Sequence, residues 1–385
     1  MSSKLSGRRI RLGMVGGGQG ALIGNVHRIA ARIDDEYVLV AGALSSDPQR
    51  AAASAREIGI DDERSYANFA DMAAAEAARE DGIEVVAVVT PNHLHHPIAK
   101  AFLDAGIHVI CDKPLTVTSE QSRELIDAAA RANRILAVTY NYSGYPMIRQ
   151  ARAMVASGEL GNIRLVQAEY AQDWLADAIE QTGQKQAAWR TDPAKSGAGG
   201  CIGDIGTHAY QLATFVTGLT LESLCADLSR FVEGRRLDDN AALLLRFKGG
   251  AKGMLWASQV AVGNENGLSL RVYGDKGGLS WRQEAPNELW FTTLGGSAQR
   301  ITRGGAAAGA DACRMSRIPA GHPEGYLEAF ASIYTEIAAA IRAHRDGSNV
   351  DAELVFPAGE DGLKGVAFVE AAVRSSESGA GWVAL

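Results

Sequence analysis

The chain has 385 residues, which is enough for two domains of ordinary size. Apolar residues make up 46% of it and charged residues 22%, as expected for a globular protein with a substantial core. Lys and Arg number 38 against 45 Asp and Glu, a formal charge of −7 with no basic block, which argues against a nucleic-acid partner.

Membrane, metal and disulfide classes are also disfavoured. No apolar run approaches the ~18 residues of a membrane span, and the first residues lack the pattern of a signal peptide. The four cysteines lie far apart without a CxxC pair. This spacing predicts neither a zinc site nor a disulfide framework, and it fits a reducing cytoplasm.

The first part of the chain alternates strand-like and helix-like segments. Strands are predicted at 9–15, 37–44, 83–90, 107–111 and 134–139, and helices at 21–32, from 48 onward, at 95–105 and at 119–132. Such alternation is typical of a doubly wound parallel sheet, an α/β fold of the Rossmann type. We therefore predict a dinucleotide-binding domain over residues 1–140.

The pattern changes after residue 145. From residue 163 strands dominate, with glycine-bearing turns between several of them, which predicts a large, mostly antiparallel open sheet. Helices are expected at 146–157, 206–217, 323–344 and 359–375, and a loop at 294–309. We assign 141–385 to a C-terminal domain for substrate binding and oligomerisation. Its closing helix at 359–375 is a candidate to pack back toward the first domain.

A glycine turn follows the first strand. Gly16, Gly18, Gln19 and Ala21 lie in the stretch GMVGGGQGA, between that strand and a helix. Glycines permit a sharp turn and a close approach of the backbone to a pyrophosphate, and the helix N-terminus then faces the phosphates. We predict that this turn binds NAD or NADP.

The ribose end leaves the choice of cofactor open. NAD-binding domains usually carry an acid at the end of the second strand, where this chain has Ser45 and Ser46. Asp47 is close enough to substitute for that acid. Arg50 could instead pair with a 2′-phosphate, which would favour NADP.

Three stretches together resemble the Gfo/Idh/MocA family of oxidoreductases, which includes inositol dehydrogenases and glucose–fructose oxidoreductase. They are VGGGQG, TPNHLHHPIAKAFLDAGIHVICDKPLT at 90–116, and AGGCIGDIGTHAYQLATFVTG at 198–218. The resemblance implies a catalytic lysine at Lys113 and a catalytic pair at Asp204 and His208. It also suggests a cis bond between Lys113 and Pro114.

The chain departs from the family pattern twice. The acid before the lysine is usually Glu and is Asp112 here, which either ends the strand or helps to hold Lys113. Three residues after the histidine the family often has Asp, and this chain has Gln211.

The chemistry of these residues is consistent with the implied roles. Oxidation of a secondary alcohol needs a base for the hydroxyl proton, and the unperturbed pKa of a histidine such as His208 suits that base. Asp204 lies four residues earlier and would share a helical face with it. Lys113 could stabilise a developing alkoxide.

Other candidate contacts follow from position. Thr90, Pro91, Asn92 and His95 follow a parallel strand, and the resemblance places their loop along the nicotinamide ribose, near Asp112 and Lys113. The HLHH run lacks a third ligand pattern, so no metal is expected. The candidate substrate contacts are Tyr145, Arg190 and His322, and such a polar pocket with few charges suits a polyol or sugar.

The sequence thus predicts a cytoplasmic NAD(P)-dependent dehydrogenase that oxidises a secondary hydroxyl of an inositol-like polyol or a pyranose. The alternatives are an NADP-dependent sugar reductase, a hydrolase that uses transient oxidation, and a non-catalytic nucleotide-sensing regulator on the same fold. We expect a homo-oligomer, a dimer or tetramer, joined through the open face of the C-terminal sheet.

Overall fold

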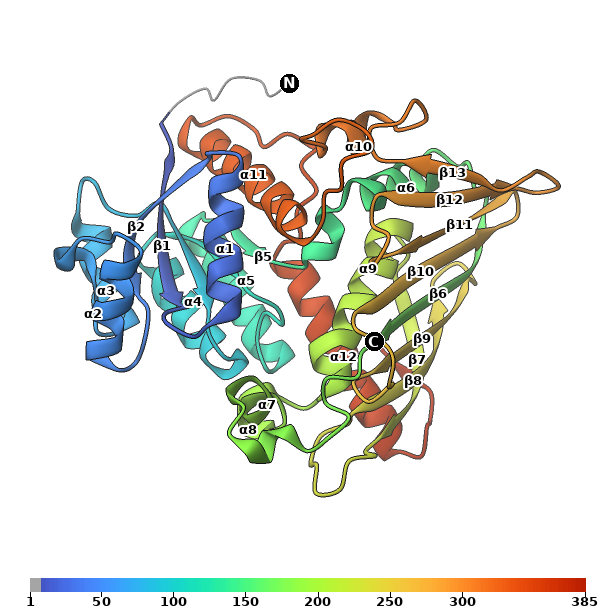
Figure 1. The fold of residues 1–385 in the computed structure, drawn as a ribbon, viewed down its shortest axis with the longest axis horizontal. Coiled ribbons are helices and arrows are strands. Elements are labelled where there is room, and N and C mark those ends of the chain that lie inside the picture. Colours follow the sequence, from blue (N-terminus) through green and yellow to red (C-terminus); the bar gives the residue numbers. More distant parts are fainter. Residues whose placement is uncertain (1–7) are drawn as a thin grey trace. The chain divides into compact units, whose positions relative to one another are not determined.

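The computed structural model describes residues 8–385, and these form two compact units (Figure 1). The first unit contains residues 8–141 and 326–363, and the second contains 142–325 and 364–385. Residues 326–363, which fall inside the predicted C-terminal domain, therefore belong to the first unit.

The first unit is built on a five-stranded parallel sheet of order β2-β1-β3-β4-β5. Every side chain of β3 is buried, as expected for a strand covered on both faces. The order reverses between β1 and β3, and ligands of such sheets bind at the carboxyl edge near that point. The strands are β1 (Ile10–Gly16), β2 (Tyr37–Ala43), β3 (Val85–Val89), β4 (His108–Cys111) and β5 (Leu136–Val138).

Helices cover this sheet, and the last of them comes from far along the chain. The helices are α1 (Leu22–Ile33), α2 (Pro48–Glu57), α3 (Phe69–Ala78), α4 (His95–Asp104), α5 (Ser119–Ala132) and α11 (Tyr326–Arg345). Helix α11 packs against α1. Its Tyr334 hydroxyl lies 2.8 Å from Nδ1 of the buried His27, and its carbonyl oxygen accepts a hydrogen bond from the Tyr37 hydroxyl at 2.7 Å. These buried contacts join 326–363 to the first unit.

The second unit contains a nine-stranded sheet of order β13-β12-β11-β10-β6-β9-β8-β7-β14. Its neighbouring strands are antiparallel except for β6 and β9, which are parallel. The strands are β6 (Ile163–Ala171), β7 (Leu221–Ser229), β8 (Asn240–Phe247), β9 (Lys252–Ser258), β10 (Gly267–Gly274), β11 (Gly277–Arg282), β12 (Glu288–Thr293), β13 (Gln299–Thr302) and β14 (Val383–Ala384).

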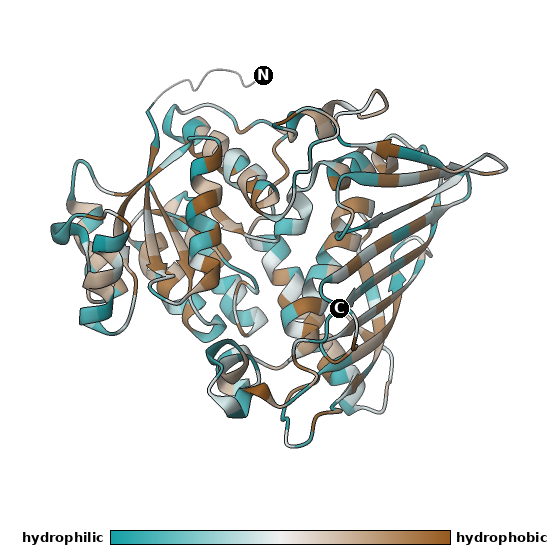
Figure 2. Cartoon of the chain, in the orientation of Figure 1, coloured by the Kyte–Doolittle hydropathy of each residue, from teal (hydrophilic) through white to brown (hydrophobic). Residues whose placement is uncertain are grey.

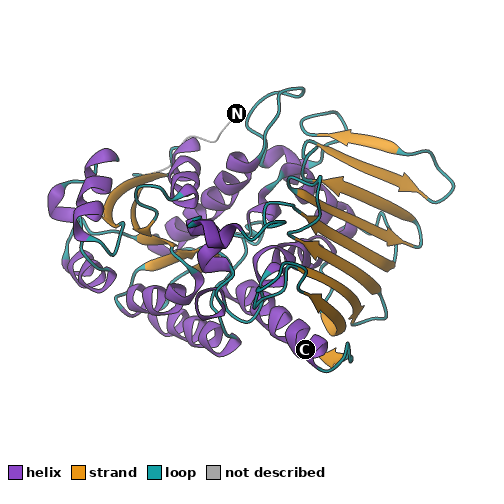
Figure 3. Cartoon of the chain, turned by 60° about the horizontal axis from the view of Figure 1, so that its bottom comes forward, coloured by secondary structure: helices purple, strands orange, loops and turns teal. Residues whose placement is uncertain are grey.

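Helices of this unit cover one face of the sheet and leave the other bare (Figure 3). Helix α9 packs on β6, β9 and β10, and α6 packs on β11 and β12. Tyr210 of α9 stacks on Phe368 of α12 with ring centroids 4.3 Å apart. The helices are α6 (Pro146–Ala156), α7 (Lys185–Arg190), α8 (Pro193–Ser196), α9 (Thr207–Thr217), α10 (Ala310–Arg314) and α12 (Gly359–Glu377), the last of which starts in the first unit.

Side chains alternate along the central strands. In β8 Leu243 and Leu245 are buried while Leu244, between them, is exposed, as strand geometry requires. Hydrophobic segments recur along these strands (Figure 2). Apolar side chains therefore lie on both faces of the sheet.

The predicted fold class is confirmed: a parallel Rossmann sheet is followed by a large, mostly antiparallel one. Strand β13 falls inside the stretch predicted as a loop at 294–309, so that prediction was wrong there. Its four residues, QRIT, show little hydrophobic alternation and are ordered by pairing with β12.

Candidate active site

The turn between β1 and α1 has the geometry of a phosphate cradle. Gly16 and Gly17 have φ of 83° and 72°, a region that side chains rarely adopt. A Cβ on Gly18 would lie 2.6 Å from the carbonyl oxygen of Leu44, and one on Gly24 would lie 2.3 Å from Cα of Gly17. These glycines therefore allow an approach of backbone to backbone that any side chain would block.

A cavity of about 460 Å³ opens on this turn. Residues 17–22 line it together with Asn25, Arg28, Ser54 and Glu57. Ala21 precedes α1 and has no side chain to cap the first N–H groups, which a phosphate can then satisfy. The Gln19 backbone N–H donates to Ser54 Oγ at 3.0 Å, and its side-chain amide donates to Glu57 at 2.9 Å. Shape and donor groups both fit a dinucleotide.

The residues predicted for the ribose end lie between the end of β2 and the first turn of α2. Asp47 is the N-cap of α2, and its Oδ1 accepts a hydrogen bond from the Arg50 backbone N–H at 2.7 Å. The Ser45 hydroxyl accepts one from the Asp47 N–H at 3.1 Å. Ser46 and the Arg50 side chain are exposed. A carboxylate and a guanidinium are thus both present at the ribose end, where the sequence leaves the choice between NAD and NADP open.

Asp112 holds the backbone of the loop that carries Lys113. Its Oδ1 accepts hydrogen bonds from the Lys113 backbone N–H at 2.8 Å and from the Thr139 hydroxyl at 3.0 Å. Its own N–H donates to the Val88 carbonyl at 2.9 Å, which extends the parallel ladder by one bond. The bond between Lys113 and Pro114 is cis. Asp112 therefore fixes the path of the chain at Lys113.

His95 connects the same loop to the preceding one. Its ring is 1% exposed, and its Nδ1 and Nε2 each lie 2.8 Å from a carbonyl oxygen, those of Pro114 and Thr90 respectively. Both ring nitrogens are thus engaged by the backbone. Asn92 of this loop is buried as well, so the loops after β3 and β4 form one tightly held edge.

Asp204, in the second unit, lies in a π-helical turn, Ile202–Gly206, directly before α9. Its Oδ2 accepts hydrogen bonds from Arg190 Nε at 3.2 Å and from Gln259 Nε2 at 2.9 Å. The prediction that Asp204 shares an α-helical face with His208 was therefore wrong, because Asp204 lies in the wider π-helical turn. Single π turns in helices are frequent at functional sites.

His208 is buried among tyrosines. Its ring meets that of Tyr142 edge-on, with centroids 4.9 Å apart and an interplanar angle of 81°. The Tyr142 hydroxyl lies 2.5 Å from that of Tyr170, which donates to Asn266 at 2.7 Å. Burial raises the pKa of Tyr142, and the nearby charge of Asp204 adds to that rise. Tyr142 thus contacts the His208 ring and lies within the electrostatic influence of Asp204.

Comparison with known proteins shows the family of this chain. Residues 10–140 match the model of an oxidoreductase family with an NAD-binding Rossmann fold, and 148–280 match the GFO/IDH/MocA C-terminal domain. The chain is 38% identical to the uncharacterized oxidoreductase YfiI of Bacillus subtilis, over 98% of this chain and 99% of the relative. The chain belongs to the Gfo/Idh/MocA family of oxidoreductases.

Two solved structures extend the likeness over nearly the whole chain. An oxidoreductase from Sinorhizobium meliloti is 54% identical, with a TM-score of 0.89, over 98% of this chain and 100% of that one. An inositol dehydrogenase homolog from Azotobacter vinelandii, complexed with NADH and myo-inositol, is 38% identical with a TM-score of 0.92, over 98% of each chain. The family resemblance seen in the motifs is confirmed.

In this Gfo/Idh/MocA chain the predicted site residues divide between the units. Those from Gly16 to Lys113 belong to the first unit, and Tyr145, Arg190, Asp204, His208 and His322 belong to the second. Within the second unit Arg190 bonds Asp204, and Tyr145 stacks on Tyr142 with centroids 6.0 Å apart. His322 is exposed, and its carbonyl oxygen accepts a hydrogen bond from the buried Arg303. The roles of these residues stay predictions.

Several neighbours of the predicted residues were missed by the motifs. Gln259 follows β9, Tyr170 lies in β6 and Asn266 precedes β10, so each comes from a different strand. Trp174 lies beside the Arg190 guanidinium, with its ring centroid 5.9 Å from the Arg190 Cζ. Only a polar residue just past a strand end, as at Gln259, could have suggested such a role from sequence.

Gln211, the second departure from the family pattern, lies three residues after His208 on α9. Its side chain is 5% exposed, and within residues 8–385 its Oε1 has no hydrogen-bond partner. A buried carbonyl oxygen in that state is costly unless a ligand supplies a donor. The change at this position therefore leaves a buried carbonyl oxygen without a partner among residues 8–385.

Residues 8–385 also bear on metal binding and on membrane insertion. No group of three His, Cys, Asp or Glu side chains in this range is placed to hold a metal ion. None of the helices there is long and apolar enough to cross a membrane.

The glycine turn generates a direct prediction for cofactor binding. Gly18→Ala places a Cβ against the Leu44 carbonyl and should move the turn, raising the Kd for NADH by about tenfold or more. Fluorescence titration measures that Kd. Ala53→Ser, which adds one atom on the exposed part of α2, is the control and should bind NADH normally. Equal affinities in the two variants would contradict the role given to the turn.

Proposed function

We propose that this chain is an NAD(P)-dependent dehydrogenase that oxidises a secondary hydroxyl of a cyclic polyol or sugar to a ketone. The observation that carries the proposal is the arrangement around Asp204 and His208. A titratable imidazole lies against a tyrosine, and the nearby carboxylate is bound by a guanidinium and an amide. This combination offers a base and several hydroxyl-directed groups with little net charge.

In the proposed reaction the bound nicotinamide accepts a hydride from the carbon that bears the hydroxyl. His208 takes the hydroxyl proton, since imidazole can exchange a proton near neutral pH. Asp204, which pairs with Arg190, accepts a hydrogen bond from the imidazole or from a substrate hydroxyl. Lys113 donates to the substrate oxygen and stabilises negative charge that develops on it.

Myo-inositol is the first substrate to test. The inositol dehydrogenase homolog of Azotobacter vinelandii is complexed with it, and that relative matches 98% of this chain. Aromatic rings and neutral amides also suit the faces and hydroxyls of a pyranose. Inositol isomers, aldoses and anhydrosugars therefore form one screen, read by the absorbance of NADH. Absence of turnover across that screen would count against the proposal.

The proposed cofactor is NAD. Asp47 puts a carboxylate at the ribose end, where it can accept a hydrogen bond from a ribose hydroxyl and would repel a 2′-phosphate. The competing form, an NADP-dependent sugar reductase, is supported by the exposed Arg50 beside Ser45 and Ser46.

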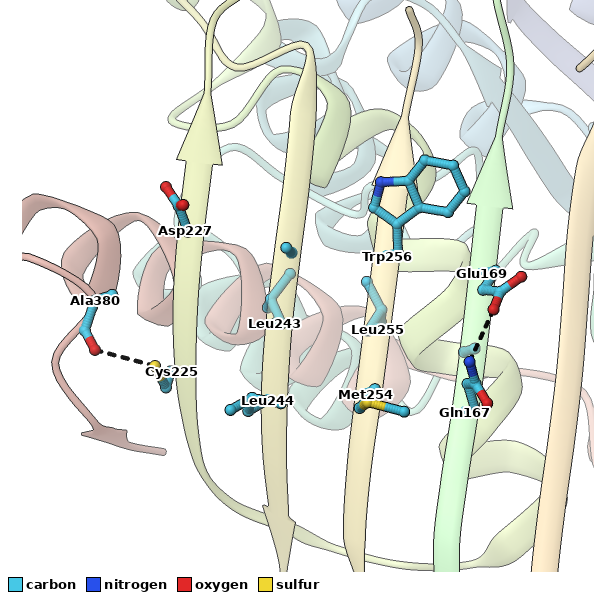
Figure 4. A pocket seen from close by; sticks show the side chains of 12 residues that line it. Gln167, Glu169, Cys225, Asp227, Leu243, Leu244, Met254, Leu255, Trp256 and Ala380 are labelled. Carbon is cyan, nitrogen blue, oxygen red and sulfur yellow. Dashed lines mark hydrogen bonds between the residues drawn. The ribbon is translucent and has the colours of Figure 1, made fainter. Parts of the chain in front are cut away.

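The bare face of the nine-stranded sheet is proposed to bind a second copy of the chain. Leu244, Met254 and Trp256 are 49%, 51% and 39% exposed there. They line a cavity of about 410 Å³ that also includes Gln167 and Cys225 (Figure 4). A contiguous apolar surface on a sheet is typical of an interface and a liability in a monomer. This supports a homo-oligomer, either a dimer or a tetramer.

The choice of cofactor gives the second prediction. NADH should bind at least about tenfold more tightly than NADPH, because Asp47 opposes a 2′-phosphate. Titration of both cofactors by fluorescence measures this ratio. Arg50→Ala should leave the NADH Kd unchanged. A preference for NADPH that Arg50→Ala reverses would favour the reductase instead.

Lys113 gives the third prediction. Lys113→Ala should lower kcat roughly 100- to 10,000-fold, because a positioned donor is lost, while the Kd for NADH is kept. Initial rates with the substrate found in the screen measure kcat. Lys100→Ala, which removes a half-exposed lysine of α4, is the matched control and should turn over normally. Full turnover in the Lys113 variant would exclude this mechanism.

The sheet face gives the fourth. Leu244→Glu puts a charge in the middle of the apolar face and should convert the oligomer to monomer, as measured by light scattering after size exclusion. Leu294→Glu makes the same change at an exposed position between β12 and β13 and should leave the mass unchanged. An oligomer that survives the Leu244 change would rule out this face.

A further inference from the structure

Two adjacent acids at the start of β8 lie outside every motif discussed so far. Asp238 binds three successive backbone N–H groups of the segment before Asp204. Its Oδ1 accepts from Gly200 at 2.7 Å, its Oδ2 from Ile202 at 2.8 Å, and its carbonyl oxygen from Cys201 at 2.8 Å. Every N–H of residues 200–202 is thus bound to one residue.

Those three residues begin the turn that presents Asp204. The Asp204 N–H donates to the Gly200 carbonyl at 2.9 Å, and the π-helical turn starts at Ile202. Gly200 also lies very close to this support, since a Cβ there would be 2.2 Å from the Asp238 carbonyl oxygen. A shift of Asp238 must therefore move the backbone on which the Asp204 side chain is mounted.

The next acid, Asp239, fixes a second group that contacts Asp204. Its carbonyl oxygen accepts a hydrogen bond from the Gln259 backbone N–H at 2.9 Å, and the Gln259 side chain donates to Asp204 at 2.9 Å. The Asp239 carboxylate accepts from the N–H groups of Phe231 and Val232, both at 2.9 Å in their shorter contacts. This residue is itself 1% exposed.

A third connection to the surroundings of Asp204 is made by Arg235, which joins Asp239 to the segment before α7. Its guanidinium lies 3.4 Å from the Asp239 carboxylate and donates to both oxygens of Glu180 at 3.1 Å. It also donates to the Asp177 carbonyl at 2.9 Å. These bonds anchor the segment that leads to α7, which carries Arg190, the remaining partner of Asp204.

We infer that Asp238 and Asp239 are the positioning pair of the site. Asp238 holds the turn that carries Asp204. Asp239 holds Gln259 directly and, through Arg235, the segment that leads to Arg190. The inference rests on the proposed function, in which Asp204 serves the reaction. Neither acid touches the substrate in this scheme. Each acts through the backbone that it holds.

The cost of burying Asp238 supports a role beyond stability. Burial raises its pKa to about 6, although the two N–H groups act in the opposite direction. A carboxyl with a raised folded-state pKa contributes stability below its unfolded value near 4, and loses it as the pH rises through about 6. At neutral pH the charged form therefore weakens the fold, yet it is the form that accepts both N–H groups.

The test compares Asp238→Asn with Glu233→Gln, an exposed acid of the same loop. The Asn amide can accept from one N–H only and opposes the other, so the turn should loosen. We expect faster hydrogen exchange of the amides at 200–204 and a kcat lowered about 100-fold, as for a misplacement near 1 Å, with an unchanged KM for NAD⁺. Glu233→Gln should match the wild type in all three.

Hydrogen exchange needs no substrate, so it separates this inference from the proposed function. If the screen finds no turnover, the proposed function fails while the exchange data still decide whether Asp238 holds the turn. Wild-type exchange in Asp238→Asn would overturn the inference, as would wild-type kcat.

If Asp238→Asn does not fold, Gly200→Ala, which keeps the carboxylate and pushes the turn away from it, decides. Loss of kcat with unchanged KM for NAD⁺ supports the inference, and wild-type kcat overturns it. Failure of both variants to fold would show that the pair is merely structural, and would overturn the inference too.

Discussion

The dominant constraint on both units is that backbone N–H groups at the ends of strands and helices need partners when they are buried. At the loop after β4 the partner is the Asp112 carboxylate, which binds the Lys113 N–H. At the turn before α9 it is Asp238, which binds the N–H groups of Gly200 and Ile202. The same hydrogen bonds that satisfy the backbone therefore fix the main chain from which Lys113 and Asp204, the side chains predicted to react, project.

Hydrophobic periodicity predicted most of the fold because buried strands such as β3 are apolar throughout and helices such as α5 bury residues along one face. The strand at 83–90 and the helix at 119–132 could be read from their own residues. Strand β13 could not, since its order comes from pairing with β12 rather than from its composition. The π-helical turn at Asp204 was also hidden, because an extra residue per turn leaves no mark on a short segment rich in glycine.

The candidate site was predictable where several residues lie in one motif and unpredictable where they meet only in space. Asp204 and His208 share a short stretch, so the resemblance could assign both. Gln259 follows β9 and Asp238 precedes β8, so the sequence hides both the bond from Gln259 to Asp204 and the bond from Gly200 to Asp238. Asp112 is the opposite case. Its place in the motif was evident from the sequence, but only its hydrogen bonds show that it supports the backbone at Lys113.

The charges around Asp204 bear on which ligands the second unit can accept. Arg190 neutralises the carboxylate, and the remaining groups near it and His208 are amides and phenols: Gln259, Asn266 and Tyr142. A neutral polyol would leave this balance intact, whereas a sugar phosphate or a sugar acid would add a charge without a second cation to pair it among these residues. Discrimination among neutral polyols would then depend on the direction of their hydroxyls relative to these groups.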